Sequence, residues 1–136
     1  MRILMIVAFS LASTGGALSA QCLSGASNVF SISQWEAFES PAGGYPSIRY
    51  DVLNGLDKGV RMVSAYVTAE DALGRTVVQH FGVPRDLVLA SGQSTTIEAT
   101  SRELGADRFL TVNPDDLTVS FCLRSVVYED GTKEEF

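Results

Sequence analysis

The sequence predicts an all-β protein built as a sandwich of two antiparallel sheets. Apolar residues recur at every second position in many short runs, which is typical of strands with one buried face and one solvated face. No run shows the 3.6-residue period of a helix over about a dozen residues, so the crossover helices that a parallel sheet requires are not expected. Turn-forming residues separate the runs at spacings of roughly 8 to 12 residues, which predicts seven or eight strands.

The first two expected strands, 29–38 and 47–53, are joined by a turn at the Pro-Ala-Gly-Gly run 41–44. Phe30 and Ile32 face one side of the first strand. In the second strand the apolar residues Ile48, Tyr50 and Val52 alternate with the charged residues Arg49 and Asp51. One face of this strand is therefore expected in the core and the other in solvent.

The third and fourth expected strands form a hairpin. The third strand, 60–68, is apolar on both faces, which is typical of a central strand. The run 70–74 connects it to a strand at 75–83. Pro84 ends that strand because proline has no N–H to donate to a neighbour.

The second half of the chain has less regular signals. Further strands are expected at 87–89, 95–100, 109–112 and 117–128, with a turn at 113–116 before the last of them. The run 101–108 alone has helical character, and it is long enough for a turn or two. The acidic end of the chain, Glu129-Asp130 and Glu134-Glu135, is expected as a solvated tail.

Residues 1–20 have the pattern of a secretory signal peptide. Arg2 precedes an apolar run of about 10 residues, and small residues then lead to Ala20. The run is too short to span a bilayer, and no second apolar stretch approaches membrane-spanning length. We therefore expect cleavage near Ala20, one domain comprising residues 21–136, and a periplasmic or secreted location.

The chain has two cysteines, Cys22 and Cys122. An even number of cysteines in an exported chain predicts a disulfide, which would tie the start of the mature protein to a segment near its end. The alternative is a lipid anchor, since a cysteine just after a leader resembles the bacterial lipoprotein signal. Gln21 argues against the anchor because that signal has a small residue directly before the cysteine.

Five runs of the chain carry a further pattern. They are "YDVLN" at 50–54, "VSAYV" at 63–67, "EDALGR" at 70–75, "LASGQS" at 89–94 and "VYEDGT" at 127–132. Together they resemble small immunoglobulin-like domains of the FxLYD and late-embryogenesis-abundant type. The resemblance implies an immunoglobulin-like sandwich with an interaction or structural role and without a catalytic centre.

Candidate catalytic residues are few. His80 is the one histidine, so a serine or cysteine nucleophile would depend on it as the general base. It lies inside an expected strand, and Ser91, in a turn, lacks the Gly-x-Ser-x-Gly elbow of hydrolases. The adjacent carboxylates Glu70 and Asp71 point to opposite faces if extended. The sequence therefore predicts no catalytic residue and places His80 in a structural or surface role.

No cofactor or metal site is expected. One histidine and two paired cysteines cannot enclose zinc or copper. Oxygen ligands for calcium occur in two places, Asn113-Asp115-Asp116 and Asp51-Asn54-Asp57, but neither has EF-hand spacing and turn formation explains both. Trp35 is expected in the core or at its rim rather than as a platform for a ligand.

The charge of the chain limits its partners. With 10 basic and 16 acidic residues and a formal net charge of −6, nucleic acid and anionic membranes are poor partners. The sequence predicts a non-catalytic module that binds another envelope or extracellular protein through its sheet edges and acidic loops. One alternative is a structural component that assembles by strand addition. Another is a calcium binder or a hydrolase.

Overall fold

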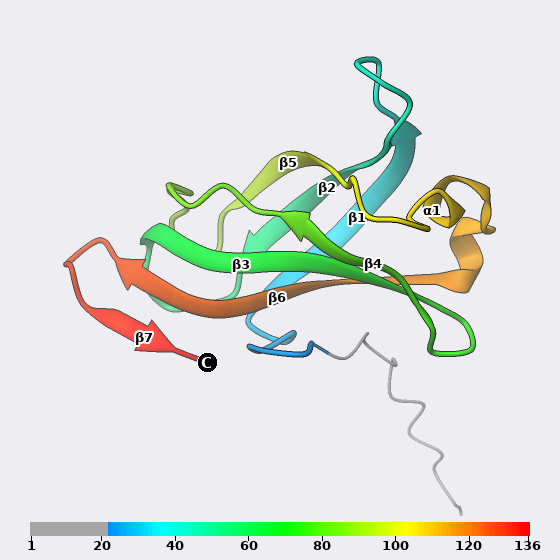
Figure 1. Ribbon diagram of the computed structural model, residues 1–136. Helices are drawn as coiled ribbons and strands as arrows, with labels where there is room; N and C mark the ends of the chain where they lie inside the picture. The colour runs from blue at the N-terminus through cyan, green and yellow to red at the C-terminus, as the bar shows by residue number, and fades with distance from the viewer. Residues whose placement is uncertain (1–21) are drawn as a thin grey trace, which may run out of the picture.

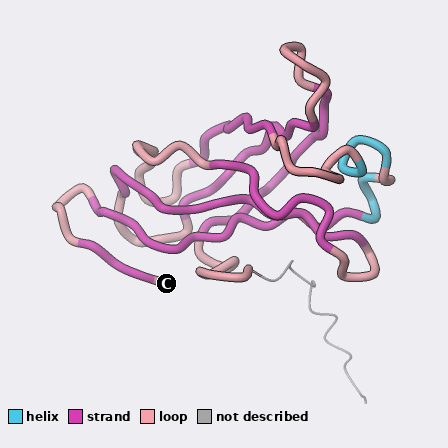
Figure 2. The backbone as a smooth tube through the Cα atoms, viewed as in Figure 1, coloured by secondary structure: helices cyan, strands magenta, loops and turns pink. Residues whose placement is uncertain are grey.

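The computed structural model describes residues 22–136, which form two antiparallel sheets packed face to face (Figure 1). The strands are β1 (Phe30–Glu39), β2 (Pro46–Asn54), β3 (Val60–Asp71), β4 (Thr76–Gly82), β5 (Ser94–Thr100), β6 (Leu117–Tyr128) and β7 (Lys133–Glu135), and the short helices are α1 (Arg108–Thr111) and η1 (Pro114–Asp116). Strand makes up most of the described chain, and loops gather mainly at the two ends of the sandwich (Figure 2). The expected leader, 1–20, lies outside the described residues.

The strand order is that of an immunoglobulin-like sandwich. One sheet has the order β1-β2-β5 and the other β4-β3-β6-β7. If the strands are lettered A, B, C, C′, E, F and G along the chain, the two sheets read A-B-E and C′-C-F-G. The all-β, two-sheet prediction is therefore confirmed, and seven strands are observed.

The alternation expected for β2 is confirmed. Ile48, Tyr50 and Val52 are buried, whereas Arg49 is exposed. β3 is a central strand, as its two apolar faces predicted, because it pairs with β4 on one side and with β6 on the other. Because β3 has a neighbour on both sides, its backbone N–H and C=O groups are hydrogen-bonded along most of its length. The pairing also fixes which side chains of β3, β4 and β6 lie next to one another.

Aromatic rings from both sheets form the centre of the core. Phe121 of β6 stacks on Phe30 of β1, with ring centroids 5.4 Å apart. Toward one end of the sandwich, the ring centroid of Phe109 in α1 lies 5.6 Å from that of Trp35 and 5.1 Å from that of Phe81. Trp35 is half-buried, so its expected position at the rim of the core is confirmed.

Four expectations for irregular segments need correction. The strand expected at 109–112 is instead the single helical turn α1, which inserts the buried ring of Phe109 into the end of the sandwich. The helical turn expected within 101–108 therefore lies further along the chain, at Arg108–Thr111. The strand expected at 87–89 is an isolated bridge between Leu89 and Val60. Within the acidic end, 133–135 is exposed as expected, yet it pairs with β6 as β7.

The hydroxyl of Tyr50 is buried in this core. Its side chain is 1% exposed, and the oxygen meets no hydrogen-bonding group of residues 22–136. Because a buried polar group without a partner is unfavourable, we expect Tyr50→Phe to raise the free energy of unfolding by about 1 kcal/mol. Urea denaturation of the two proteins measures the change. The matched control is Tyr66→Phe, since the hydroxyl of Tyr66 is hydrogen-bonded to Ser24, and that substitution is expected to cost about 1 kcal/mol.

The same substitution has a second readout at alkaline pH. Burial raises the pKa of Tyr50 above its ordinary value of about 10. The unfolded chain therefore ionises first, and the free energy of unfolding falls as the pH rises above about 10. Tyr50→Phe should make the decline in stability above this pH less steep. A loss of stability at pH 7 in Tyr50→Phe would contradict the assignment of an unpaired hydroxyl.

Candidate functional site

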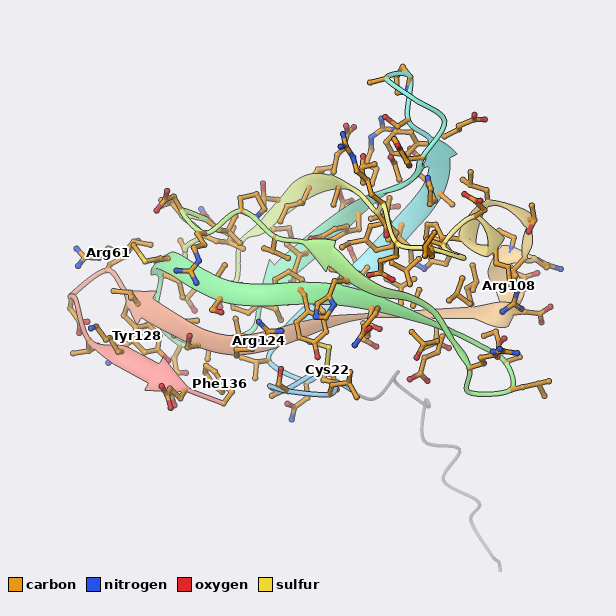
Figure 3. The ribbon with its side chains drawn as sticks, viewed as in Figure 1. Cys22, Arg61, Arg108, Arg124, Tyr128 and Phe136 are labelled. Carbon is orange, nitrogen blue, oxygen red and sulfur yellow. A yellow bond between two sulfur atoms is a disulfide. The ribbon has the colours of Figure 1, made fainter. Side chains whose placement is uncertain are left out.

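The predicted disulfide is present and joins Cys22 to Cys122 of β6. Phe121 and Leu123 point into the core, so Cys122 between them points outward from the four-stranded sheet. The bond therefore holds the segment 22–26, which we call the N-terminal clamp, against that outward side. Figure 3 shows Cys22 and Arg124 on the same side of this sheet.

Backbone contacts seat the clamp beside β6. Ala26 and Leu123 exchange two N–H···O bonds, with N···O distances of 2.9 and 3.0 Å. Gly25 permits this close approach because its φ is +85° and a Cβ there would lie 2.4 Å from the Leu123 carbonyl oxygen. The clamp thus covers part of the edge of β6 that β7 leaves free.

A cluster of polar and aromatic side chains lies under the clamp. The hydroxyl of Tyr66 donates to the Ser24 carbonyl at 3.1 Å and accepts from the Ser24 N–H at 3.2 Å. The Arg124 guanidinium lies 4.6 Å from the Tyr66 ring centroid, and its Nε donates to the Ser24 hydroxyl at 2.9 Å. The His80 ring lies 4.5 Å from that of Tyr66. Four separate segments therefore meet at one point of the sheet.

The side chain of His80 lies at the surface, beside Arg124. Its Nε2 lies 3.4 Å from an Arg124 nitrogen, and its side chain is exposed. Ser91 does not share a hydrogen bond with it, because the Ser91 hydroxyl donates to the carbonyl of Leu56 in another loop. The structure does not bring these two residues together as a nucleophile and its base.

Three of the six residues considered as calcium ligands have other hydrogen-bonding partners. Asn113 accepts from the Asp115 N–H and caps η1. Buried Asn54 bonds three backbone groups of its own turn and of the loop at Leu89. Asp51 accepts from Thr96 and Gln34, which hold the pKa of its carboxyl below the usual range. Across the region that the structure describes, no three His, Cys, Asp or Glu residues gather into a metal-binding group.

On the exposed side of the three-stranded sheet, the charged side chains pair with one another. Arg49 of β2 forms ion pairs with Glu36 of β1 and Glu98 of β5, and these two glutamates hold the pKa of its guanidinium above the usual value. Beside them lies the hydrogen-bonded group around Asp51 described above. Charges on this side therefore find their partners within the sheet.

The corresponding side of the four-stranded sheet, which we call the outer face, is different. Register places the following side chains on it: Met62, Ser64 and Tyr66 of β3, Cys122, Ser125 and Val127 of β6, and Lys133 and Glu135 of β7. Arg124 of β6 joins them through its contact with the Tyr66 ring. A shallow groove crosses the outer face over β3, β6 and β7, and Arg85 lines the groove from the loop after β4. Met62 is 39% exposed in this groove, and Val127 opposite it is partly exposed.

The sheet edges differ in how open they are. β7 is a three-residue strand with three exposed charged side chains. β4 is bulged at Gln79 and His80, whose N–H groups both donate to the Glu103 carboxylate, at 2.9 and 2.6 Å. Short, charged and bulged strands resist pairing with other chains. β1 has ten residues, more than any other edge strand, and its interruption is a bulge at Ser33.

Sequence reasoning missed both the side-chain cluster under the clamp and the contact of the Glu103 carboxylate with the bulge of β4. The apolar character of both faces of β3 was a signal that its outward side chains are not ordinary solvated residues, and Met62 and Tyr66 belong to that pattern. No corresponding signal linked Ser24 with Arg124, since 100 residues separate them.

Comparisons with known proteins yield no relative: no family model, curated protein or solved structure matches this chain. The helices within residues 22–136 are single turns, and none has the length and apolar character needed to cross a membrane.

Proposed function

We propose that the chain is an exported, non-catalytic module that binds another envelope or extracellular protein through its outer face. The contrast between the two exposed sheet surfaces carries this proposal. Arg49 is neutralised by Glu36 and Glu98 on the three-stranded sheet, whereas Arg85 and Arg124 belong to none of the ion pairs of the described chain. Uncompensated charge beside exposed apolar surface is typical of an interaction site.

The disulfide supports export, because such bonds persist in oxidising compartments and are rare in the cytosol. Cleavage near Ala20 and a periplasmic or secreted location agree with it. The contacts of His80 support a role without catalysis, since its imidazole faces Tyr66 and Arg124 rather than a serine or cysteine nucleophile.

Assembly by strand addition is the second candidate, and the length of β1 favours it. The outer edge of this strand has no neighbouring strand among residues 22–136. An added strand would pair with β1 after the bulge, from Gln34 to Glu39. The two candidates place the partner at different positions on the molecule.

Photo-crosslinking distinguishes these positions. A benzoylphenylalanine would replace Val127 in the groove, Ser33 at the edge of β1, or Thr96 on the self-paired side of β5. Each variant would be expressed in the organism that encodes the chain. We expect a discrete heavier adduct, dependent on ultraviolet light, from position 127 and none from the matched control at position 96.

Each outcome decides between the candidates. An adduct from position 33 alone would replace face binding with strand addition. Adducts of twice the mass of the chain would identify a second copy as the partner. Absence of adducts from all three positions, with the protein exported and folded, would contradict the proposed binding function.

A further inference from the structure

Arg124 is held in a defined orientation on the outer face. It occupies the bulge of β6, where Leu123 pairs with Ala65 and Ser125 with Ser64, so Arg124 itself has no residue opposite it. Its guanidinium rests over the Tyr66 ring, 4.6 Å from the centroid. Bulges commonly redirect a side chain, and an arginine whose position is already set loses less entropy when it binds a ligand.

This guanidinium keeps most of its hydrogen-bonding capacity. It has five N–H donors, of which one bonds Ser24 at 2.9 Å and another faces His80 at 3.4 Å. No carboxylate among residues 22–136 forms an ion pair with it. The remaining donors have the planar fork geometry that matches a carboxylate.

The charges around Arg124 define where an anion fits. Lys133 and Glu135 are two positions apart on the same side of β7 and offset each other. Arg85, across the groove, is a second cation without an acidic partner in the described part of the chain. In a chain with a net charge of −6, the outer face therefore carries two arginines, Arg85 and Arg124, that have no ion-pair partner within residues 22–136.

The apolar floor of the groove lies along the same strand. Val127 is three residues beyond Arg124 and is paired with Met62. At a rise of about 3.3 Å per residue, the Cα atoms of Arg124 and Val127 are roughly 10 Å apart along β6. An extended segment would span both if an acidic and an apolar side chain are two to four residues apart.

We propose that the outer face binds an extended acidic segment of a partner protein, with a carboxylate on Arg124 and an apolar side chain over Met62 and Val127. This inference rests on the proposed function and adds the chemistry of the partner. Arg85 attracts a second carboxylate from the opposite side of the groove. Glu135 repels a carboxylate placed over β7, so the acidic side chain of the segment is expected at Arg124 instead.

Synthetic peptides test this chemistry. The probe is an acetylated ten-residue peptide of Glu, Leu and Thr with one Glu and one Leu three residues apart, and its control has Gln in place of Glu. Titration into the isotope-labelled, oxidised protein should shift the Arg124 Nε–H signal, the Met62 methyl signal and the amide signals of Ser64 and Ser125. We expect Arg124→Gln to weaken binding of the acidic peptide about tenfold or more.

Matched variants separate the site from general charge. Arg85→Gln lies outside the clamp and should weaken binding without affecting the fold. Arg75→Gln and Arg102→Gln remove the same charge elsewhere and should leave the affinity unchanged. Equal binding of the Gln peptide, or an equal loss in Arg75→Gln, would overturn the proposal.

The crosslinking experiment distinguishes failure of this inference from failure of the binding function. If the adduct at position 127 persists at full yield in the Arg85→Gln/Arg124→Gln background, the partner binds the outer face without acid recognition and only the present inference fails. If position 127 forms no adduct in the wild-type background either, the proposed face binding fails.

Discussion

Reduction of the disulfide between Cys22 and Cys122 is expected to lower the free energy of unfolding by about 2 to 5 kcal/mol. The bond closes a loop across a sequence separation of 100 residues. In the chain-entropy model, a cross-link of this span removes about 4 to 5 kcal/mol of conformational freedom from the unfolded chain. A domain of this size has a total stability of roughly 5 to 15 kcal/mol, so the loss is a large fraction of it.

The structural consequence of reduction should be local before it is global. Ala26 would still be joined to Leu123 by two backbone bonds, but the clamp would lose its covalent tether. Hydrogen exchange at these two amides is therefore expected to speed up more than exchange at central core amides such as Val67. The sandwich itself should remain folded at 25 °C in the reduced state.

Urea denaturation with and without a phosphine reductant measures this effect on one chain. The control is Cys22→Ala/Cys122→Ala, whose midpoint the reductant should not change. Equal midpoints for the oxidised and reduced wild-type protein would contradict the prediction, as would a mass showing two free thiols in the exported protein.

Asn54→Asp is expected to destabilise the fold by roughly 3 to 5 kcal/mol at pH 7. Asn54 is 1% exposed at the end of β2. Its amide nitrogen donates to the carbonyls of Lys58 at 3.2 Å and Leu89 at 3.1 Å, and its oxygen accepts from Leu56 at 2.9 Å. A carboxylate there would place negative charge against two carbonyl oxygens inside the protein.

The effect should depend on pH in a defined direction. Burial beside carbonyl oxygens raises the pKa of an aspartate at position 54 in the folded state above its unfolded value of about 3.9. The unfolded chain therefore ionises first, and the destabilisation relative to wild type grows as the pH rises from about 4 to 7. Below pH 4 the neutral carboxyl can donate one hydrogen bond, and the difference should shrink.

Asn113→Asp is the matched control, because it makes the same chemical change at a surface turn. Asn113 caps η1 by accepting from Asp115, and aspartate performs this role equally well. Its expected effect is under about 1 kcal/mol. Similar losses in both variants, measured by urea denaturation at pH 4 and 7, would show that burial of Asn54 is not the cause.

Period-two patterns predicted the regular strands because burial of one sheet face imposes that period on the sequence. The alternation in β2 specified which side chains enter the core, and the run 70–74 specified the β3–β4 hairpin. Cysteine number predicted the disulfide, since two cysteines allow only one pairing. These are local or counting arguments that do not require knowledge of distant contacts.

Short irregular segments were not predictable in the same way. Four residues of strand and one helical turn have no distinguishing period, so the sequence alone predicts a strand at 109–112. What places α1 there is the space between Trp35 and Phe81 that the ring of Phe109 fills. Likewise, β7 forms because the turn after Tyr128 returns the chain along β6. The charged side chains of β7 are equally typical of a solvated tail, so the sequence did not predict the strand.

The sequence by itself determined the fold class, the inward residues of the regular strands and the covalent link between the two ends of the domain. Only the tertiary structure decided which surface is uncompensated. Ser24, Tyr66, His80 and Arg124 come from four segments, and they meet because strand register, a bulge in β6 and the clamp place them together. Local patterns report burial, whereas the pairing of charges depends on which distant strands become neighbours.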